Sequence, residues 1–194
     1  MNYLAHIYLA RHDDDAMLGA LLGDFVFGVS GPDVYAPTIR REILLHRRID
    51  RYTDAHPSVV AARALFTDGR RRYAGITLDV YYDHLLARDW AQWSEIDLDA
   101  FTARFYAHLL ANHAQLPARL QTIAPLMAQH DWLGSYRERA SVDRAVRRIA
   151  TRLSRNGDKL VTCLEDLRMH EPAIERGFHA LLSDLVVQAA ELRS

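Results

Sequence analysis

The stretch "ITLDVYYDHLLARDW" (residues 76–90) has the spacing of a helix whose apolar side chains extend nearly all the way round. A helix with so little polar surface is normally buried by its neighbours. The same stretch nevertheless contains Asp79, Asp83 and His84. Because an ionised carboxylate is expensive to bury without a partner, these side chains need water, a basic side chain or a metal ion. The stretch therefore predicts a core helix that borders a polar site.

Helical periodicity continues through the rest of the 194-residue chain. The pattern contains no alternating pair of strands joined by a hairpin turn and no internal repeat. The breakers include "EP" (171–172), and Pro57 and Pro172 suit the first turns of helices. Apolar residues recur at helix spacing within 18–25, 39–44, 59–66, 101–110, 142–153 and 174–186. We expect one compact, all-α, multi-helix domain spanning residues 1–194, with about eight to ten helices.

Composition and charge exclude several classes of protein. Hydrophobic residues make up 49% and charged residues 25% of the chain, as in ordinary folded proteins. The formal net charge of −1 argues against general nucleic-acid binding. The most apolar stretch, "MLGALLGDFVFGV" (17–29), is too short to span a bilayer and contains an aspartate. With a single cysteine, Cys163, and no recognisable signal peptide, we expect a cytoplasmic protein without a disulfide framework.

A second group of polar residues repeats at helix spacing in "HRRIDRYTD" (46–54). His46, Asp50 and Asp54 stand four residues apart, which puts them on one face of a helix, and Asp79 and Asp83 have the same spacing. Pairs of this kind can offer two metal ligands from one rigid element. Imidazoles and carboxylates without a usable thiolate favour Mn²⁺, Mg²⁺ or Fe²⁺, with Zn²⁺ also compatible.

Each of these groups also has an interpretation without a metal. The stripe that begins at His46 could be a solvated face paired with Arg47 and Arg51, and the acids of the core helix could pair with the same arginines. Two glycines four residues apart precede Asp24, so that a neighbouring helix can approach closely and Asp24 could simply support the contact. His6 alone could be a hydrogen-bonded core histidine.

Four segments of the chain resemble the bacterial acyl carrier protein phosphodiesterases, also called acyl carrier protein hydrolyases. They match in order and spacing over roughly the first 95 residues: "MNYLAHIYLA" (1–10), "LLGDFVFG" (21–28), "HRRIDRYTDAHP" (46–57) and "GITLDVYYDHLLARDW" (75–90). The resemblance implies hydrolysis of the phosphodiester between 4′-phosphopantetheine and a serine of holo-acyl carrier protein. It also implies an HD-like fold with a preference for Mn²⁺, because the family is a divergent relative of the HD-type metal phosphohydrolases.

The resemblance also implies roles for particular residues. The usual His-Asp dyad is reversed here, as Asp83-His84, so only positions inside the quoted motifs are carried over. The expected metal ligands are Asp24, His46, Asp83 and His84, and His6 also falls in a quoted motif. Asp50 is expected to be a further ligand or to orient His46. Asp79 is expected to orient the attacking water or to protonate the leaving oxygen.

Arginines of the second motif region are expected to bind the substrate. Arg47 and Arg48 could bind phosphate, and Arg51 with Arg40 and Arg41 could form a docking surface for the acidic carrier protein. Two other functions stay open from the sequence. One is an HD-like phosphohydrolase that acts on nucleotides or another small phosphoester, and the other is a catalytically silent module that binds acyl carrier protein.

Overall fold

The computed structural model describes residues 1–28 and 31–193, and within these ranges the chain forms helices without any β-strand. The expected all-α fold is therefore confirmed. The α-helices are α1 (Tyr3–Leu9), α2 (Asp14–Leu22), α3 (Pro37–Ala55), α4 (Pro57–Ala64), α5 (Arg71–Arg88), α6 (Leu98–Ala111), α7 (Ala118–Gln129), α8 (Arg139–Ala150) and α9 (Gly157–Glu191). Short 3₁₀ turns are η1 (Gly31–Val34), η2 (Trp90–Gln92), η3 (His113–Gln115) and η4 (Gly134–Arg137). One buried apolar cluster contains side chains from Met1 to Ala189.

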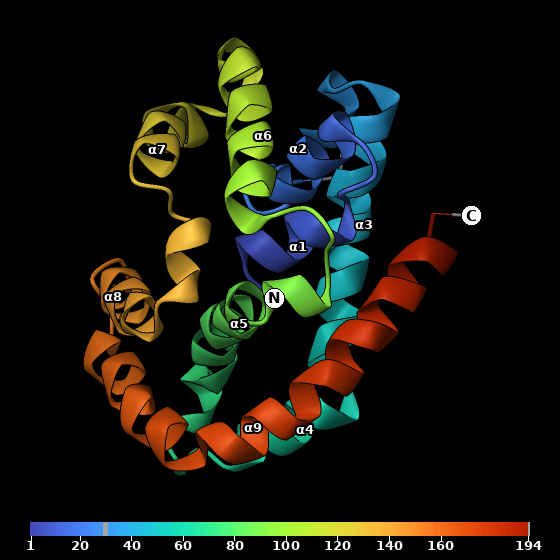
Figure 1. Ribbon diagram of the computed structural model, residues 1–194. Helices are drawn as coiled ribbons and strands as arrows, with labels where there is room; N and C mark the ends of the chain where they lie inside the picture. Colours follow the sequence, from blue (N-terminus) through green and yellow to red (C-terminus); the bar gives the residue numbers. More distant parts are fainter. Residues whose placement is uncertain (29–30, 194) are drawn as a thin grey trace.

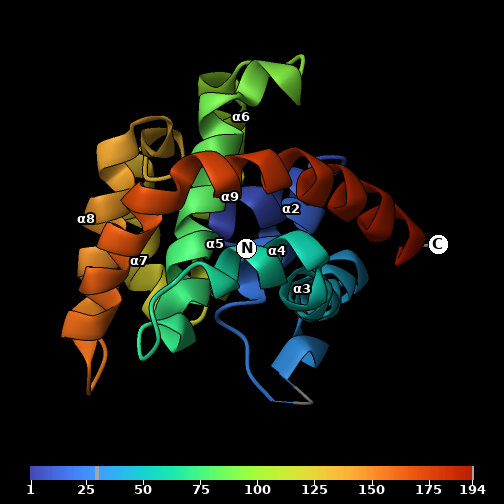
Figure 2. The same ribbon diagram turned by 90° about the horizontal axis from the view of Figure 1, so that it is seen from below.

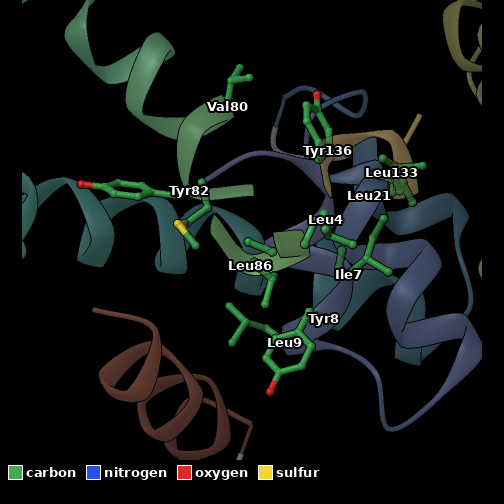
Figure 3. Close-up of a cluster of buried hydrophobic side chains, with 14 of the residues drawn as sticks. Leu4, Ile7, Tyr8, Leu9, Leu21, Val80, Tyr82, Leu86, Leu133 and Tyr136 are labelled. Carbon is green, nitrogen blue, oxygen red and sulfur yellow. The ribbon is translucent and has the colours of Figure 1, made fainter. Parts of the chain in front are cut away.

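Helix α5 lies inside the bundle, as its apolar composition predicts (Figure 1). It packs against α1, α4, α8, α9 and η4. Leu78, Tyr82 and Leu86 are each at most 1% exposed. Figure 3 shows Leu86 beside Leu4 and Ile7 of α1, and helix α1 packs against α2 as well as α5.

The carboxylate of Asp83 explains how this core helix holds a buried acid. Its Oδ2 accepts a hydrogen bond from the backbone N–H of Leu4 at 2.8 Å, and its Oδ1 accepts one from Ala5 at 3.0 Å. These N–H groups belong to the first turn of α1, where they have no partner within the helix. The side chain of Asn2, at the N-cap position, makes no capping bond. Asp83 therefore fixes the start of α1 against α5.

Helices α2 and α3 cross closely because two glycines face the crossing. A Cβ built on Gly19 would lie 2.5 Å from the carbonyl oxygen of Ile39, and one built on Gly23 would lie 2.2 Å from Cγ of His46. No larger residue fits at either position without a shift of α3. The close approach expected from the glycine spacing is therefore confirmed, and it sets Asp24 against the His46 ring.

The prediction that Pro172 lies in a first helical turn is wrong. Helix α9 runs from Gly157 to Glu191 with Pro172 inside it, and it curves past α8, α5 and α4 (Figures 1 and 2). Proline removes one helical hydrogen bond. The helix continues because Leu167 on one side of the proline and Phe178 on the other are both buried in the core. No helix of the described ranges has the length and apolar composition that a bilayer crossing requires.

The bond between Asp83 and α1 can be tested by stability measurements. Asp83→Ala should lower the free energy of unfolding by about 2–4 kcal/mol, because two buried N–H groups lose their acceptor. Asp54→Ala, on α3 and 63% exposed, should cost less than about 1 kcal/mol. Urea unfolding with a chelator present measures both. If wild type and Asp83→Ala were equally stable under chelation, Asp83 would not support α1.

Candidate metal centre

Three potential ligand side chains converge where α1 meets α3. The Nε2 atom of His6 lies 2.9 Å from Oδ1 of Asp50, and Nε2 of His46 lies 3.2 Å from Oδ2 of the same carboxylate. The two imidazole rings are stacked with 3.7 Å between their centroids. One ligand atom from each of the three residues lies within 4.8 Å of the others, and no other group of this kind occurs in the part of the chain that the structure describes. We call these three residues and Asp24 the His-Asp cluster.

Asp24 joins the cluster from the segment that follows α2. Its Oδ1 lies 3.6 Å from Nε2 of His46. The other ring nitrogen of His46, Nδ1, donates to the carbonyl oxygen of Ala20 at 2.8 Å. This bond fixes the ring orientation and, in the neutral imidazole, places the lone pair on Nε2, which faces the two carboxylates.

Asp79 lies at the edge of the cluster. The amino group of Met1 lies 3.0 Å from Oδ1 of Asp79 and 3.7 Å from Oδ1 of Asp50, so it stands between the two carboxylates. The side chains of Asp24, Asp50 and Asp79 are 40%, 42% and 41% exposed, whereas both imidazoles are buried. The cluster therefore has a buried side made by histidines and a side open to solvent made by carboxylates.

The two histidines have opposite pKa shifts. Burial alone would lower the pKa of His46, but hydrogen bonds to Asp24 and Asp50 and their charges outweigh it and raise the pKa to about 9. Burial, followed by repulsion from His46, lowers the pKa of His6 to about 4. The pKa of Asp50 is lowered by its bonds to both imidazoles, which outweigh its burial. Two stacked rings cannot readily both be charged, so the proton resides on His46, which faces two carboxylates.

The structure does not bring together all four predicted ligands. Asp24 and His46 lie in the cluster, but both oxygens of Asp83 are bound to the backbone of α1. Nδ1 of His84 donates to the carbonyl oxygen of Tyr136 at 2.7 Å, on the side of α5 that faces η4. One step along a helix turns a side chain by about 100°, which separates His84 from the stripe of Asp79 and Asp83.

His6 takes a more central place than the sequence indicates. A single histidine in an apolar segment has no local spacing that marks it as a ligand, and only its position in the first quoted motif pointed to it. The predicted stripe on α3, in contrast, contributes only its first two members. Asp54 pairs with Arg63 of α4 at 3.3 Å, which fits the solvated interpretation for that residue.

The arginines predicted to bind substrate have other contacts. Arg47 donates through Nη2 to the carbonyl oxygen of Val26 at 2.8 Å, which ties α3 to the segment after α2. Arg48 and Arg51 line a shallow cavity of about 260 Å³ that also includes Leu192, beyond the end of α9. None of the three makes a recorded contact with the His-Asp cluster in the described ranges.

The charge state of the cluster can be tested by NMR titration of metal-free protein. We expect His46 to titrate near pH 9 and His6 near pH 4. Because its pKa in the fold exceeds 6.5, protonated His46 contributes stability that is present below pH 6.5 and lost as pH rises through about 9. Asp50→Asn should lower the pKa of His46. Asp54→Asn, one turn further along α3, should leave it unchanged, and equal effects of both substitutions would contradict the geometry.

Comparisons with known proteins cover nearly the whole chain. The family model described as acyl carrier protein phosphodiesterase matches residues 1–185. A protein of that name from Serratia proteamaculans is 36% identical over 182 residues, covering 93% of this chain and 90% of the relative. Another from Salmonella dublin is 37% identical over 191 residues, covering 98% of both chains. No solved structure matches. The chain belongs to the acyl carrier protein phosphodiesterase family.

Proposed function

We propose that this protein hydrolyses the phosphodiester between 4′-phosphopantetheine and a serine of holo-acyl carrier protein, and that the His-Asp cluster is its active centre. Water is added across the P–O bond to the serine, which gives apo-acyl carrier protein and 4′-phosphopantetheine. The observation that carries the proposal is the convergence of His6, His46 and Asp50 in a chain whose relatives are named for this activity. No observation favours nucleotides as substrates.

A divalent metal ion fits the donor set of the cluster. Two imidazoles and the carboxylates of Asp24 and Asp50 are ligands that suit Mn²⁺, our preferred candidate, and also Mg²⁺ or Fe²⁺. The only thiol, Cys163, donates to the carbonyl oxygen of Lys159 in α9 and is buried away from the cluster. A metal ion bound by the cluster would lower the pKa of a bound water and neutralise charge on phosphoryl oxygens.

The protein's own side chains would orient the reaction. Asp50 holds both imidazoles through its two oxygens, and the carbonyl of Ala20 fixes the ring of His46. Asp79 has no imidazole partner and is 41% exposed beside Asp50. We assign Asp79 to orienting the attacking water, because its carboxylate can accept a hydrogen bond from that water at the open side of the cluster. We also propose a cytoplasmic location, which suits the free thiol of Cys163.

Mass spectrometry of the carrier protein tests the reaction directly. Holo-acyl carrier protein incubated with Mn²⁺-loaded enzyme should lose the mass of phosphopantetheine. Asp50→Asn should lower kcat by about 100-fold or more, because both imidazoles lose part of their support. Asp54→Asn is the matched control on the same helix face and should retain activity. Faster phosphate release from a panel of nucleotides, or binding of the carrier without turnover, would refute the proposal.

Metal titrations of single variants test the ligand set. His6→Gln and Asp24→Asn should each weaken Mn²⁺ binding by about 10-fold or more, because each removes a donor from the cluster. His84→Gln should leave the affinity unchanged, since the His84 ring is bound to Tyr136. Electron paramagnetic resonance of free Mn²⁺ measures all three variants. If the affinity for Mn²⁺ depended on His84 and not on His6, the ligand set implied by the resemblance would be correct and the cluster would not be the metal site.

A further inference from the structure

Arginines of this protein fall into two groups according to their partners. About half of those outside α8 face an acid: Arg63 pairs with Asp54 at 3.3 Å, and Arg104 pairs with Asp14 at 2.7 Å. The chain from α8 to the start of α9 is different. It carries six exposed basic residues for which no ion pair occurs in the described structure: Arg144, Arg147, Arg148, Arg152, Arg155 and Lys159. The chain has a net charge of −1, so this segment is a local concentration of unneutralised positive charge.

Helices α7 and α8 lie on the same side of the molecule (Figure 1), and both carry arginines without an acidic partner in the described ranges. Arg144 and Arg148 line a cavity of about 290 Å³ together with Trp132 and Tyr136. The guanidinium of Arg148 lies 3.9 Å from the ring centroid of Trp132. Arg119 of α7 and Arg152, just beyond α8, complete the group, which we call the basic face. Stacking on an aromatic ring leaves the guanidinium edge of Arg148 available for a carboxylate or phosphate.

The basic face adjoins the open side of the His-Asp cluster. The guanidinium of Arg119 lies 5.5 Å from the ring centroid of Phe25, which directly follows Asp24 of the cluster. The ring of Phe25 in turn lies 6.0 Å from that of Tyr3 in α1. A second link is the hydrogen bond of 2.8 Å that the amide of Asn2 donates to the hydroxyl of Tyr136, which lines the cavity. Asn2 follows Met1, whose amino group contacts Asp79 and Asp50.

Three of the α3 arginines that the sequence favoured for docking are already bound, and the other two, Arg48 and Arg51, line a separate cavity beside Leu192. Arg40 pairs with Asp33 at 2.9 Å, and Arg41 lies 3.5 Å from the carboxylate of Glu42. Arg47 is bound to the backbone of Val26. A cation that is already paired contributes little field at a distance, whereas unpaired cations steer an oppositely charged partner.

We propose that the basic face formed by Arg119, Arg144, Arg148 and Arg152 is the docking surface for an acidic protein, which, if the proposed function holds, is the acyl carrier protein. Docking there would place the modified serine of the carrier close to the His-Asp cluster. Two guanidiniums at one cavity suit a carboxylate side chain that projects from the partner. The patch has four arginines on a chain of net charge −1, which suits a small protein surface better than a long nucleic-acid backbone.

Charge reversal tests the docking surface separately from hydrolysis. The variant R144E/R148E should bind apo-acyl carrier protein about 10-fold or more weakly than wild type at low salt, and the difference should shrink at high salt. The control R72E/R176E makes the same change in net charge at exposed arginines of α5 and α9 and should bind nearly as wild type does. Apo-acyl carrier protein has no bond for the enzyme to hydrolyse. Its binding can therefore be measured even if the protein proves not to be a phosphodiesterase.

Turnover of holo-carrier gives a second measurement. R144E/R148E should raise KM with little change in kcat, and its affinity for Mn²⁺ should match wild type, which shows that the cluster is intact. If charge reversal prevents folding, R144Q/R148Q should show a smaller effect of the same sign. The proposal would be wrong if R144E/R148E and R72E/R176E weakened carrier binding equally, or if R144E/R148E did not weaken it. Loss of single-stranded RNA binding by R144E/R148E, with carrier binding unchanged, would also overturn it.

Discussion

The bond between the Asp83 carboxylate and the backbone N–H groups of Leu4 and Ala5 is the interaction on which the candidate metal centre depends. Helix α1 has only seven residues, and a helix of that length is not stable alone. It is held by its apolar face and by this bond to α5. Since α1 supplies His6, an acid on the core helix determines where an imidazole of the cluster lies. The acid that seemed to call for a metal is satisfied by backbone instead.

The rest of the cluster depends on close packing of α2 against α3. Only glycine at position 23 leaves room for the ring of His46, and the same contact brings the carbonyl of Ala20 to Nδ1 of that ring. Asp50 then joins His46 to His6 across the α1–α3 contact. The resulting group holds a proton on His46 because two carboxylates face it. A divalent cation could replace that proton and satisfy the same carboxylates, which is the physical reason to regard the group as a metal centre.

Local patterns predicted the helices well, because apolar periodicity records which face of each helix is buried. They failed at Pro172, since the continuation of α9 depends on apolar side chains that pack on both sides of the proline. For the site, spacing along α3 led to His46 and Asp50, and the glycines before Asp24 predicted the close helix contact that sets Asp24 beside them. Spacing could not show that His6 lies in the cluster while Asp83 binds the backbone of α1. The side of α1 that faces α5 depends on how the two helices cross, and their bonded residues stand 78 or 79 positions apart in the chain.

Charge along the chain shows the same difference between pattern and structure. Arginine clusters near residue 40 look like a docking surface in the sequence, yet Arg40 and Arg41 have acidic neighbours in the fold. Arg144, Arg147 and Arg148 are spread through the amphipathic helix α8 and attract less notice, but no acid pairs with them in the described structure. A basic surface is therefore defined by which cations lack partners after folding. Within the described ranges, Arg48 and Arg51 of α3 also lack acidic partners, but they line a separate cavity beside Leu192. The basic face on α7 and α8 instead reaches Phe25, the neighbour of Asp24, through Arg119, and we therefore place the acidic partner there.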